Sequence, residues 1–154
     1  MSDIRVRAFA EGDRDAFLSL YRDCLRHYGT GPARPDIEAE IVADLAAPRG
    51  MSAHLAWRGD EALGFTTWVR VYPAMDGVAI YLKELYVTAD ARGLGAGRAL
   101  MRDLATTAME IGAVRLEWGS FQPDALEFYD ALGAARKDKV HYSVAAEDLH
   151  GFAQ

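Results

Sequence analysis

The sequence predicts a mixed α/β (α+β) fold, in which helices flank both faces of a central twisted mixed sheet. Strand-like and helix-like segments alternate irregularly: one strand precedes two helices, and three strands then follow one another. A glycine-rich loop next leads from the last of these strands into a further helix, which indicates a crossover connection. The length of 154 residues suits one domain with a substantial core. We therefore expect a single domain over residues 1–154.

The first part of the chain is expected to hold one strand and two amphipathic helices. Residues 4–8 alternate between apolar side chains and arginines, which is typical of a strand with one buried face. Apolar residues then recur at three- and four-residue spacing from Asp13 to His27, before a stretch rich in glycine and proline, and this predicts a helix. A second helix is expected to begin at Pro35, because proline is tolerated in the first turn, and to end before Pro48.

The second helix is acidic. Its charged residues are Asp36, Glu38, Glu40 and Asp44, with no basic residue up to Pro48. An acidic wall would attract a cationic amine. However, amphipathic helices usually turn their charges to solvent, and acids in the first turn interact favourably with the helix dipole. We therefore expect a solvated face unless the helix lines a cleft.

The rest of the chain continues the alternation of strands and helices. Segments rich in aromatic and β-branched residues predict strands over residues 52–57, 62–71 and 78–87, the first two joined as an antiparallel hairpin. The elements expected next are a helix that ends at Gly112, a strand over residues 114–118 and a short helix from Pro123 to Gly133. Beyond Gly133 we expect one or two strands and a frayed end.

Charge and cysteine content argue against several classes of protein. The chain has 17 Lys+Arg and 23 Asp+Glu, a net charge of -6, and no basic stripe of the kind that nucleic-acid binding requires. No apolar run reaches the ~18 to 20 residues of a membrane span. The single cysteine, Cys24, cannot form an intrachain disulfide, and charged residues occupy the N-terminal stretch where a secretory signal would be apolar. We expect a cytoplasmic protein with neither a membrane nor a nucleic-acid partner.

The most informative stretch runs from Arg92 to Arg98, with glycines at positions 93, 95 and 97. Alternating glycines let the backbone approach a ligand closely, here at the positive end of the following helix. From Arg92 to Arg102 there are three arginines and no acid, so this window carries +3 and the remainder of the chain carries -9 (-6 minus +3). The site suits a phosphate or pyrophosphate, and the alternative is a tight turn with solvated arginines.

The spacing of the glycines argues against two other phosphate-binding loops. A Walker loop requires a Gly-Lys pair, which the sequence lacks. The dinucleotide fingerprint G-x-G-x-x-G, begun at Gly93, would place Arg98 where a third glycine or an alanine must pack against the strand. The pattern that fits is R/Q-x-x-G-x-G/A, present as Arg92-x-x-Gly95-x-Gly97 directly after a strand that ends Leu85-Tyr86-Val87.

On this loop and a second motif, the sequence resembles the GNAT superfamily of N-acetyltransferases. The second motif is A-x-x-F-Y-x-x-x-G, found at residues 125–133 on the helix after the next strand. Both motifs occur in the order and at the separation of the family, and the order of elements over almost the whole chain is similar to its fold. Residues 81–88 and Gly64-Phe65 further resemble the diamine/thialysine acetyltransferase branch.

The resemblance implies an enzyme that transfers an acetyl group from acetyl-CoA directly to a primary amine of a small molecule, such as a polyamine, an amino acid or an antibiotic. The alternatives are a protein or peptide N-acetyltransferase and a non-catalytic acyl-CoA-binding sensor. The loop would bind the pyrophosphate of acetyl-CoA, and a homodimer is an expectation of the same resemblance. The cofactor-binding residues that it implies are Leu85, Tyr86, Val87, Arg92, Gly93, Leu94, Gly95, Ala96, Gly97, Arg98 and Gln122.

Direct transfer requires an unprotonated amine, stabilisation of an oxyanion and protonation of the leaving thiolate. Backbone N–H groups near Leu85 and Tyr86 would stabilise the oxyanion. The resemblance implies that Tyr129 is the general acid, and the alternative is an aromatic residue packed in the core beside Phe128.

Glu84 is the candidate general base, provided that burial raises its pKa. A polar pair with Lys83 is an equally good interpretation of Glu84, and Lys83 stands where the diamine branch has an acid. Cys24 lies in an apolar helix stripe, so we expect it in the core rather than in catalysis. The four histidines lack metal-ligand spacing, and no metal is expected.

Overall fold

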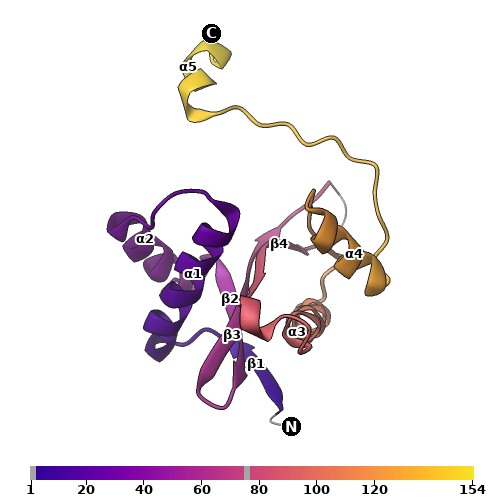
Figure 1. Ribbon diagram of the computed structural model, residues 1–154. Coiled ribbons are helices and arrows are strands. Elements are labelled where there is room, and N and C mark those ends of the chain that lie inside the picture. The colour runs from indigo at the N-terminus through magenta and orange to yellow at the C-terminus, as the bar shows by residue number, and fades with distance from the viewer. Residues whose placement is uncertain (1–2, 75–76) are drawn as a thin grey trace. The chain divides into compact units, whose positions relative to one another are not determined.

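The computed structural model describes residues 3–74 and 77–154. The chain divides into two compact units, which comprise Met1–Gly119 and Ser120–Gln154. The first unit holds the sheet and three helices, and the second holds two helices joined by an extended segment (Figure 1). The single domain expected from the sequence stays a prediction.

The first unit is built on a mixed sheet, as the sequence predicts, and this sheet has five strands. The strands are β1 (Ile4–Ala8), β2 (Ser52–Arg58), β3 (Glu61–Val71), β4 (Ala79–Val87) and β5 (Arg115–Glu117). They lie in the order β1-β2-β3-β4-β5, and every neighbouring pair is antiparallel except β4 and β5, which are parallel. The parallel pair requires a crossover, and α3 (Ala96–Glu110) supplies it.

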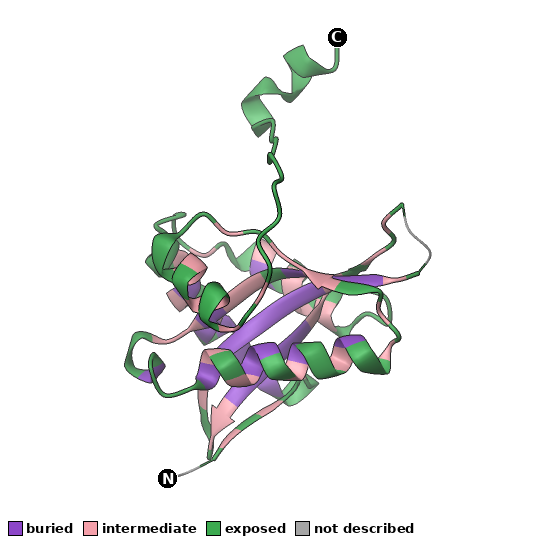
Figure 2. Ribbon diagram, turned by 90° about the vertical axis from the view of Figure 1, so that its right-hand side faces the viewer, coloured by how far each residue is buried: buried purple, intermediate pink, exposed green. Residues whose placement is uncertain are grey.

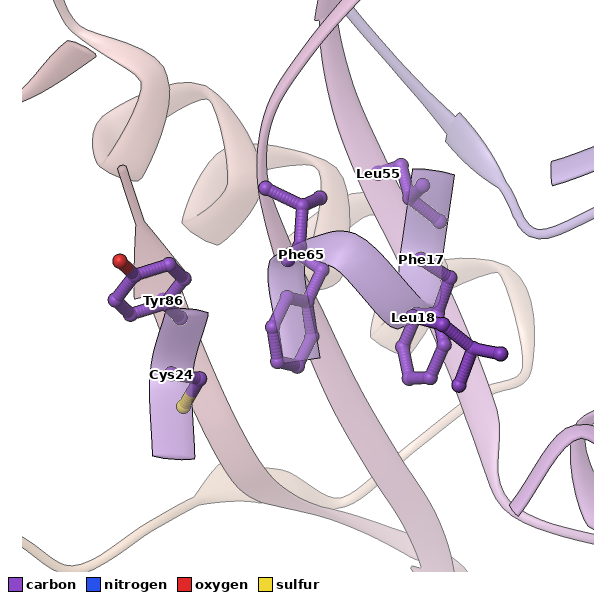
Figure 3. Packing of buried hydrophobic residues seen from close by; sticks show 8 residues of the cluster. Phe17, Leu18, Cys24, Leu55, Phe65 and Tyr86 are labelled. Carbon is purple, nitrogen blue, oxygen red and sulfur yellow. The ribbon is translucent and has the colours of Figure 1, made fainter. Parts of the chain in front are cut away.

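Helices cover both faces of this sheet. On one face, α1 (Arg14–Tyr28) packs against β2, β3 and β4 through a cluster that includes Phe17, Phe65 and Tyr86 (Figure 3). The rings of Phe17 and Phe65 meet edge to face with centroids 5.2 Å apart, and both side chains are fully buried. On the other face, Leu100 of α3 packs in a second cluster together with residues of β2 and β3. Figure 2 shows the buried residues gathered in the strands and on the sides of the helices that face them.

Ion pairs of buried side chains attach helices to their neighbours. Glu38 of α2 (Pro35–Ala46) is buried and accepts two hydrogen bonds from the guanidinium of Arg22 on α1, at 2.6 and 2.8 Å. These bonds lower the pKa of Glu38. On the opposite face of the sheet, the buried His54 of β2 pairs with Asp103 of α3. The acidic face of α2 is therefore not simply solvated as expected, because Glu38 holds this helix to α1.

The second unit corrects the expectation for the C-terminal residues. Its helices are α4 (Pro123–Ala131) and the short α5 (Leu149–Phe152), with the 3₁₀ turn η3 (Ala146–Asp148) before α5. Residues 134–145 run as an extended segment between them, and no strand is assigned to the described residues after α4. The strand or strands expected beyond Gly133 are therefore not found within this unit, because a strand requires a neighbouring strand and the unit contains no other strand.

Among the described residues, no helix has both the length and the apolar character that crossing a membrane demands.

Candidate active site

Strand β5 pairs only with the first three residues of β4 and leaves the rest of β4 with an open edge. The parallel pairs join Ala79–Tyr81 of β4 to Arg115–Glu117 of β5. On the other side, the pairing with β3 shifts register between Thr67 and Trp68, which leaves Lys83 as an extra residue on β4. A bulge of this kind bends its strand and increases its twist. Beyond Tyr81, the outer edge of β4 has no partner strand among the described residues and can pair with an extended ligand.

The three predicted binding residues at the end of β4 hold their side chains in the core. Tyr86 is buried in the α1 cluster, while Leu85 and Val87 pack against the cluster beneath α3. Successive side chains of a strand point to opposite faces, so the backbone groups remain in the plane of the sheet. Only the main-chain groups of these residues that face away from β3 could therefore contact a ligand at the open edge.

The glycine-rich loop forms the N-terminus of α3. Gly93 and Gly95 have φ values of 79° and 94°, a left-handed conformation that L side chains adopt at a cost, and Gly95 is the N-cap of the helix. No side chain caps this end, and the first turn contains no acid. The first backbone N–H groups of a helix have no acceptor within it, so those of Ala96, Gly97 and Arg98 are free to bind an anion.

Arg92 folds back from the loop onto the sheet and onto α1. Its Nε donates to the carbonyl oxygen of Val87 at 3.2 Å, and its Nη2 lies 3.4 Å from Nδ1 of His27. The guanidinium also lies over the ring of Tyr86, 5.9 Å from its centroid. Arg92 thus braces the loop against β4 and α1, a positioning role that the spacing of the motif alone does not reveal.

A pocket of about 420 Å³ opens beside this brace, between the end of α1 and the loop. Its lining residues are Asp23, Arg26, His27, Tyr86, Thr88, Ala89, Asp90 and Arg92. His27 is the member that sequence reasoning missed, because the sequence offered it only as one of four histidines without metal-ligand spacing. The sequence indicated the role of His27 only through its position at the end of the predicted helix, where the last turn of α1 lies.

Glu84 lies half-buried on the face of β4 that α1 covers. Burial raises the pKa of its carboxyl group, an effect that the charge of Lys83 partly offsets. Within the described ranges, no side-chain hydrogen bond or ion pair involves Glu84, whereas Lys83 is exposed at the bulge. Burial raises the thiol pKa of Cys24 to about 12, and the negative charge of Glu84 adds to this effect. The arrangement keeps one carboxyl group with a raised pKa free to accept a proton.

The remaining two candidates belong to the second unit. Tyr129 is half-buried on α4, and its ring centroid lies 5.3 Å from that of Phe128, which is also half-buried rather than part of a closed core. Gln122 is the N-cap of α4 and is exposed. The first unit thus brings together Glu84, the end of β4 and the glycine-rich loop, while Tyr129 and Gln122 stand on α4.

Cys24 is buried in the α1 cluster, as expected from its place in the apolar stripe. Across residues 3–74 and 77–154, no group of three or more His, Cys, Asp or Glu side chains is placed to hold a metal ion.

Comparison with known proteins identifies a family and a shared fold. The sequence matches the model of the acetyltransferase (GNAT) family over residues 14–134. A thialysine N-epsilon-acetyltransferase of Caenorhabditis elegans is 29% identical over 101 residues, which cover 64% of this chain and 58% of the relative. The enzyme of the same name from Bos taurus is 25% identical over an alignment that covers 87% of this chain and 85% of the relative. This chain therefore spans little more than half of the nematode relative that it matches.

The fold also has close counterparts among solved structures. An integron cassette protein from the mobile metagenome of V. cholerae superposes with a TM-score of 0.85 and 27% sequence identity, covering 100% of this chain and 99% of that one. The mixed sheet flanked by helices is thus a fold shared by the two proteins.

Proposed function

This chain belongs to the GNAT acetyltransferase family, and on that premise we propose that it transfers an acetyl group from acetyl-CoA directly to a primary amine of a small molecule. The observation that carries the proposal is the uncapped N-terminus of α3, which follows the open edge of β4 through a loop with glycines in the left-handed conformation. A backbone anion site next to an unpaired strand edge suits a ligand with a pyrophosphate and an amide-containing arm.

The cofactor would be held mainly by main-chain groups. The N–H groups of residues 93–98 would bind the pyrophosphate, because they lie at the positive end of the helix dipole. The backbone of Leu85, Tyr86 and Val87 would pair with the pantetheine arm, and Gln122 would add an amide contact. Acetyl-CoA supplies the activated acetyl group, and no metal is proposed.

Three groups of the chain would carry the proton and charge transfers. Glu84 would accept a proton from the ammonium group of the acceptor, because burial raises the pKa of this carboxyl towards the working pH. Backbone N–H groups near Leu85 and Tyr86 would donate to the oxyanion that develops as the amine nitrogen attacks the acetyl carbonyl. Tyr129 would protonate the thiolate as the carbon–sulfur bond breaks. No covalent enzyme intermediate is required, in keeping with the buried, inert thiol of Cys24.

The acceptor class is proposed from the relatives and from the charge near β4. The names of the matched relatives state that they acetylate the epsilon nitrogen of thialysine, a small-molecule amine. The half-buried, unpaired carboxyl of Glu84 favours a cationic acceptor. The exposed, positively charged Lys83 at the bulge disfavours an acceptor that would place further positive charges along β4. We place the reaction in the cytoplasm, in keeping with a single free cysteine.

The experiment is a thiol-release assay of the purified protein with acetyl-CoA and a panel of small amines and peptides, paired with direct measurement of acetyl-CoA binding. Amine-dependent release of CoA supports the proposal. Tight binding with no amine- or peptide-dependent release from neutral to alkaline pH would instead identify an acyl-CoA sensor. Release that depends on peptides alone would identify a protein N-acetyltransferase.

A further inference from the structure

Lys83 carries the single side-chain primary amine of the first unit. The chain has three lysines, and the other two, Lys137 and Lys139, belong to the second unit. The side chain of Lys83 is exposed, and within the described ranges neither an ion pair nor a side-chain hydrogen bond involves it. A protein proposed to acetylate primary amines thus has one of its own on β4, the strand proposed to hold the acetyl donor.

The bulge in β4 places Lys83 beside the candidate base. Glu84 pairs with Thr67 of β3, and Leu82 pairs with the residue that follows Thr67. Neighbouring residues of β3 point to opposite faces of the sheet, so Glu84 and Leu82 lie on opposite faces as well. On a regular strand, two residues at this spacing would share a face. Lys83 is the extra residue that makes the difference, and bulges next to active sites redirect side chains in this way.

The amine of Lys83 lies within reach of the groups proposed for acetyl transfer. Glu84 follows it directly, and Leu85 is two positions further, about 7 Å along the strand. The lysine amine stands on a flexible four-carbon stem, which can span such a distance. The charge of Lys83 already acts on Glu84, because it partly offsets the raised pKa of that carboxyl group. Among the described residues, no strand covers the outer edge of β4 beyond Tyr81, so this amine and a ligand on that edge can meet.

We propose that Lys83 is a self-acetylation site, modified by the acetyl-CoA that the same chain binds. The inference rests on the proposed function, because it requires the acetyl donor along β4. The nitrogen of Lys83 attacks the acetyl carbonyl carbon, so a nitrogen–carbon bond forms and the carbon–sulfur bond breaks. Of the two protons that the ammonium group loses, one ends on the sulfur of CoA and the other passes through Glu84 to solvent. The products are N-acetylated Lys83 and free CoA, and no oxidant or reductant is consumed.

Acetylation of Lys83 would change the acceptor preference of the same site. The amide is neutral, so the positive charge beside Glu84 is lost. A second cationic group on the acceptor would then no longer be repelled along β4. The unmodified chain would favour acceptors with a single amine, and the modified chain would also accept diamines and polyamines.

Mass spectrometry after incubation with acetyl-CoA alone is the first test. Peptide mapping should find Lys83 acetylated at least about 100-fold faster than Lys137 and Lys139, because a bound donor acts at a high effective concentration. Those two lysines are exposed and report uncatalysed acetylation. Excess CoA, which competes for the same site, should slow the labelling of Lys83 alone. Equal labelling rates at all three lysines would overturn the proposal.

Dilution distinguishes self-acetylation from transfer between molecules. At saturating acetyl-CoA, the fraction of Lys83 labelled per minute should be the same at every protein concentration. A labelling rate that falls in proportion to protein concentration would mean that one molecule acetylates another, and self-acetylation would be wrong.

Lys83→Arg separates this inference from the proposed function. The arginine keeps the positive charge but has no primary amine, so this variant should lose the label and still release CoA when a small amine is added. If the wild type releases CoA with amines and Lys83 stays unlabelled, the inference fails and the proposed function stands. If Lys83 is labelled and no amine or peptide supports release, the inference stands and the proposed acceptor is wrong. Neither label nor release would contradict both.

Lys83→Gln tests the effect on acceptor preference. Glutamine is neutral, as acetylated lysine is. The kcat/KM for a diamine, divided by that for a monoamine, should therefore rise by up to about 5-fold over the wild-type ratio, the range expected for one exposed charge. An unchanged ratio would show that the charge of Lys83 does not select the acceptor.

Discussion

Gly95→Ala separates the backbone conformation of the glycine-rich loop from its packing. Gly95 has a φ of 94°, and an added Cβ would meet no atom within 4 Å. The cost to stability is therefore the strain of a left-handed alanine alone, about 1–2 kcal/mol. For a chain of this length, that lowers the Tm by about 2–8 °C. Gly59→Ala is the matched control, because Gly59 between β2 and β3 has a φ of 60° and equally open surroundings.

Acetyl-CoA affinity should distinguish the two variants. A shift of the backbone at Gly95 misaligns at least one N–H group that would donate to the pyrophosphate, and a hydrogen bond to a charged group contributes about 1.5–3 kcal/mol. Gly95→Ala should therefore bind acetyl-CoA about 10–150-fold more weakly in a calorimetric titration, whereas Gly59→Ala should bind like the wild type. If both variants lose the same stability and both keep wild-type affinity, the loop does not hold the cofactor.

Three further predictions concern the chemistry and the core. Glu84→Gln should lower kcat/KM by about 10²–10⁴-fold. Wild-type activity should fall as the pH drops through the raised pKa of Glu84, because a protonated carboxyl cannot accept a proton. A pH–rate profile that is the same in both proteins contradicts this role. For Tyr129→Phe, turnover should fall far more than acetyl-CoA affinity, and unchanged turnover would remove Tyr129 from the mechanism. Phe65→Ala should lower the free energy of unfolding, measured with denaturant, by about 3–5 kcal/mol, since the side chain of Phe65 is fully buried. Phe121 is 85% exposed, so Phe121→Ala should change the free energy of unfolding by no more than about 0.5 kcal/mol. Equal losses would mean that the α1 cluster is not the core.

The sequence predicted those parts of the fold that depend on local signals. The start of α2 at Pro35 and the loop before α3 follow from proline and glycine chemistry within a few residues. The aromatic and β-branched residues of β2 and β3 likewise predict strands, and consecutive residues of both strands are buried because helices cover both faces of the sheet. The mixed sheet followed from the order of these elements, because that order permits few topologies. The family followed from the resemblance of the motifs at residues 92–97 and 125–133.

The parts that were missed depend on contacts between distant residues. The bulge at Lys83 arises from the register of two strands, which no single-strand pattern reveals. The pairing of Glu38 with Arg22 joins two helices, so an acidic stripe looked solvated in the sequence. Arg92 reaches His27, 65 positions earlier, and so braces the loop against α1, while its expected contact with the cofactor stays a prediction. Beyond Gly133, one or two strands were expected, but the pattern of a single segment cannot state where a partner strand is.

The burial of Cys24 gives experiments on this protein an unusually clean background. With a thiol pKa of about 12, on the order of one molecule in 10⁵ carries the reactive thiolate at pH 7. Because it is the single cysteine of the chain, a thiol reagent added during turnover would report CoA almost exclusively. The same property lets engineered cysteines be labelled or oxidised without first replacing a native one. The protein should also withstand storage without a reducing agent, since it offers oxidants no accessible sulfhydryl group.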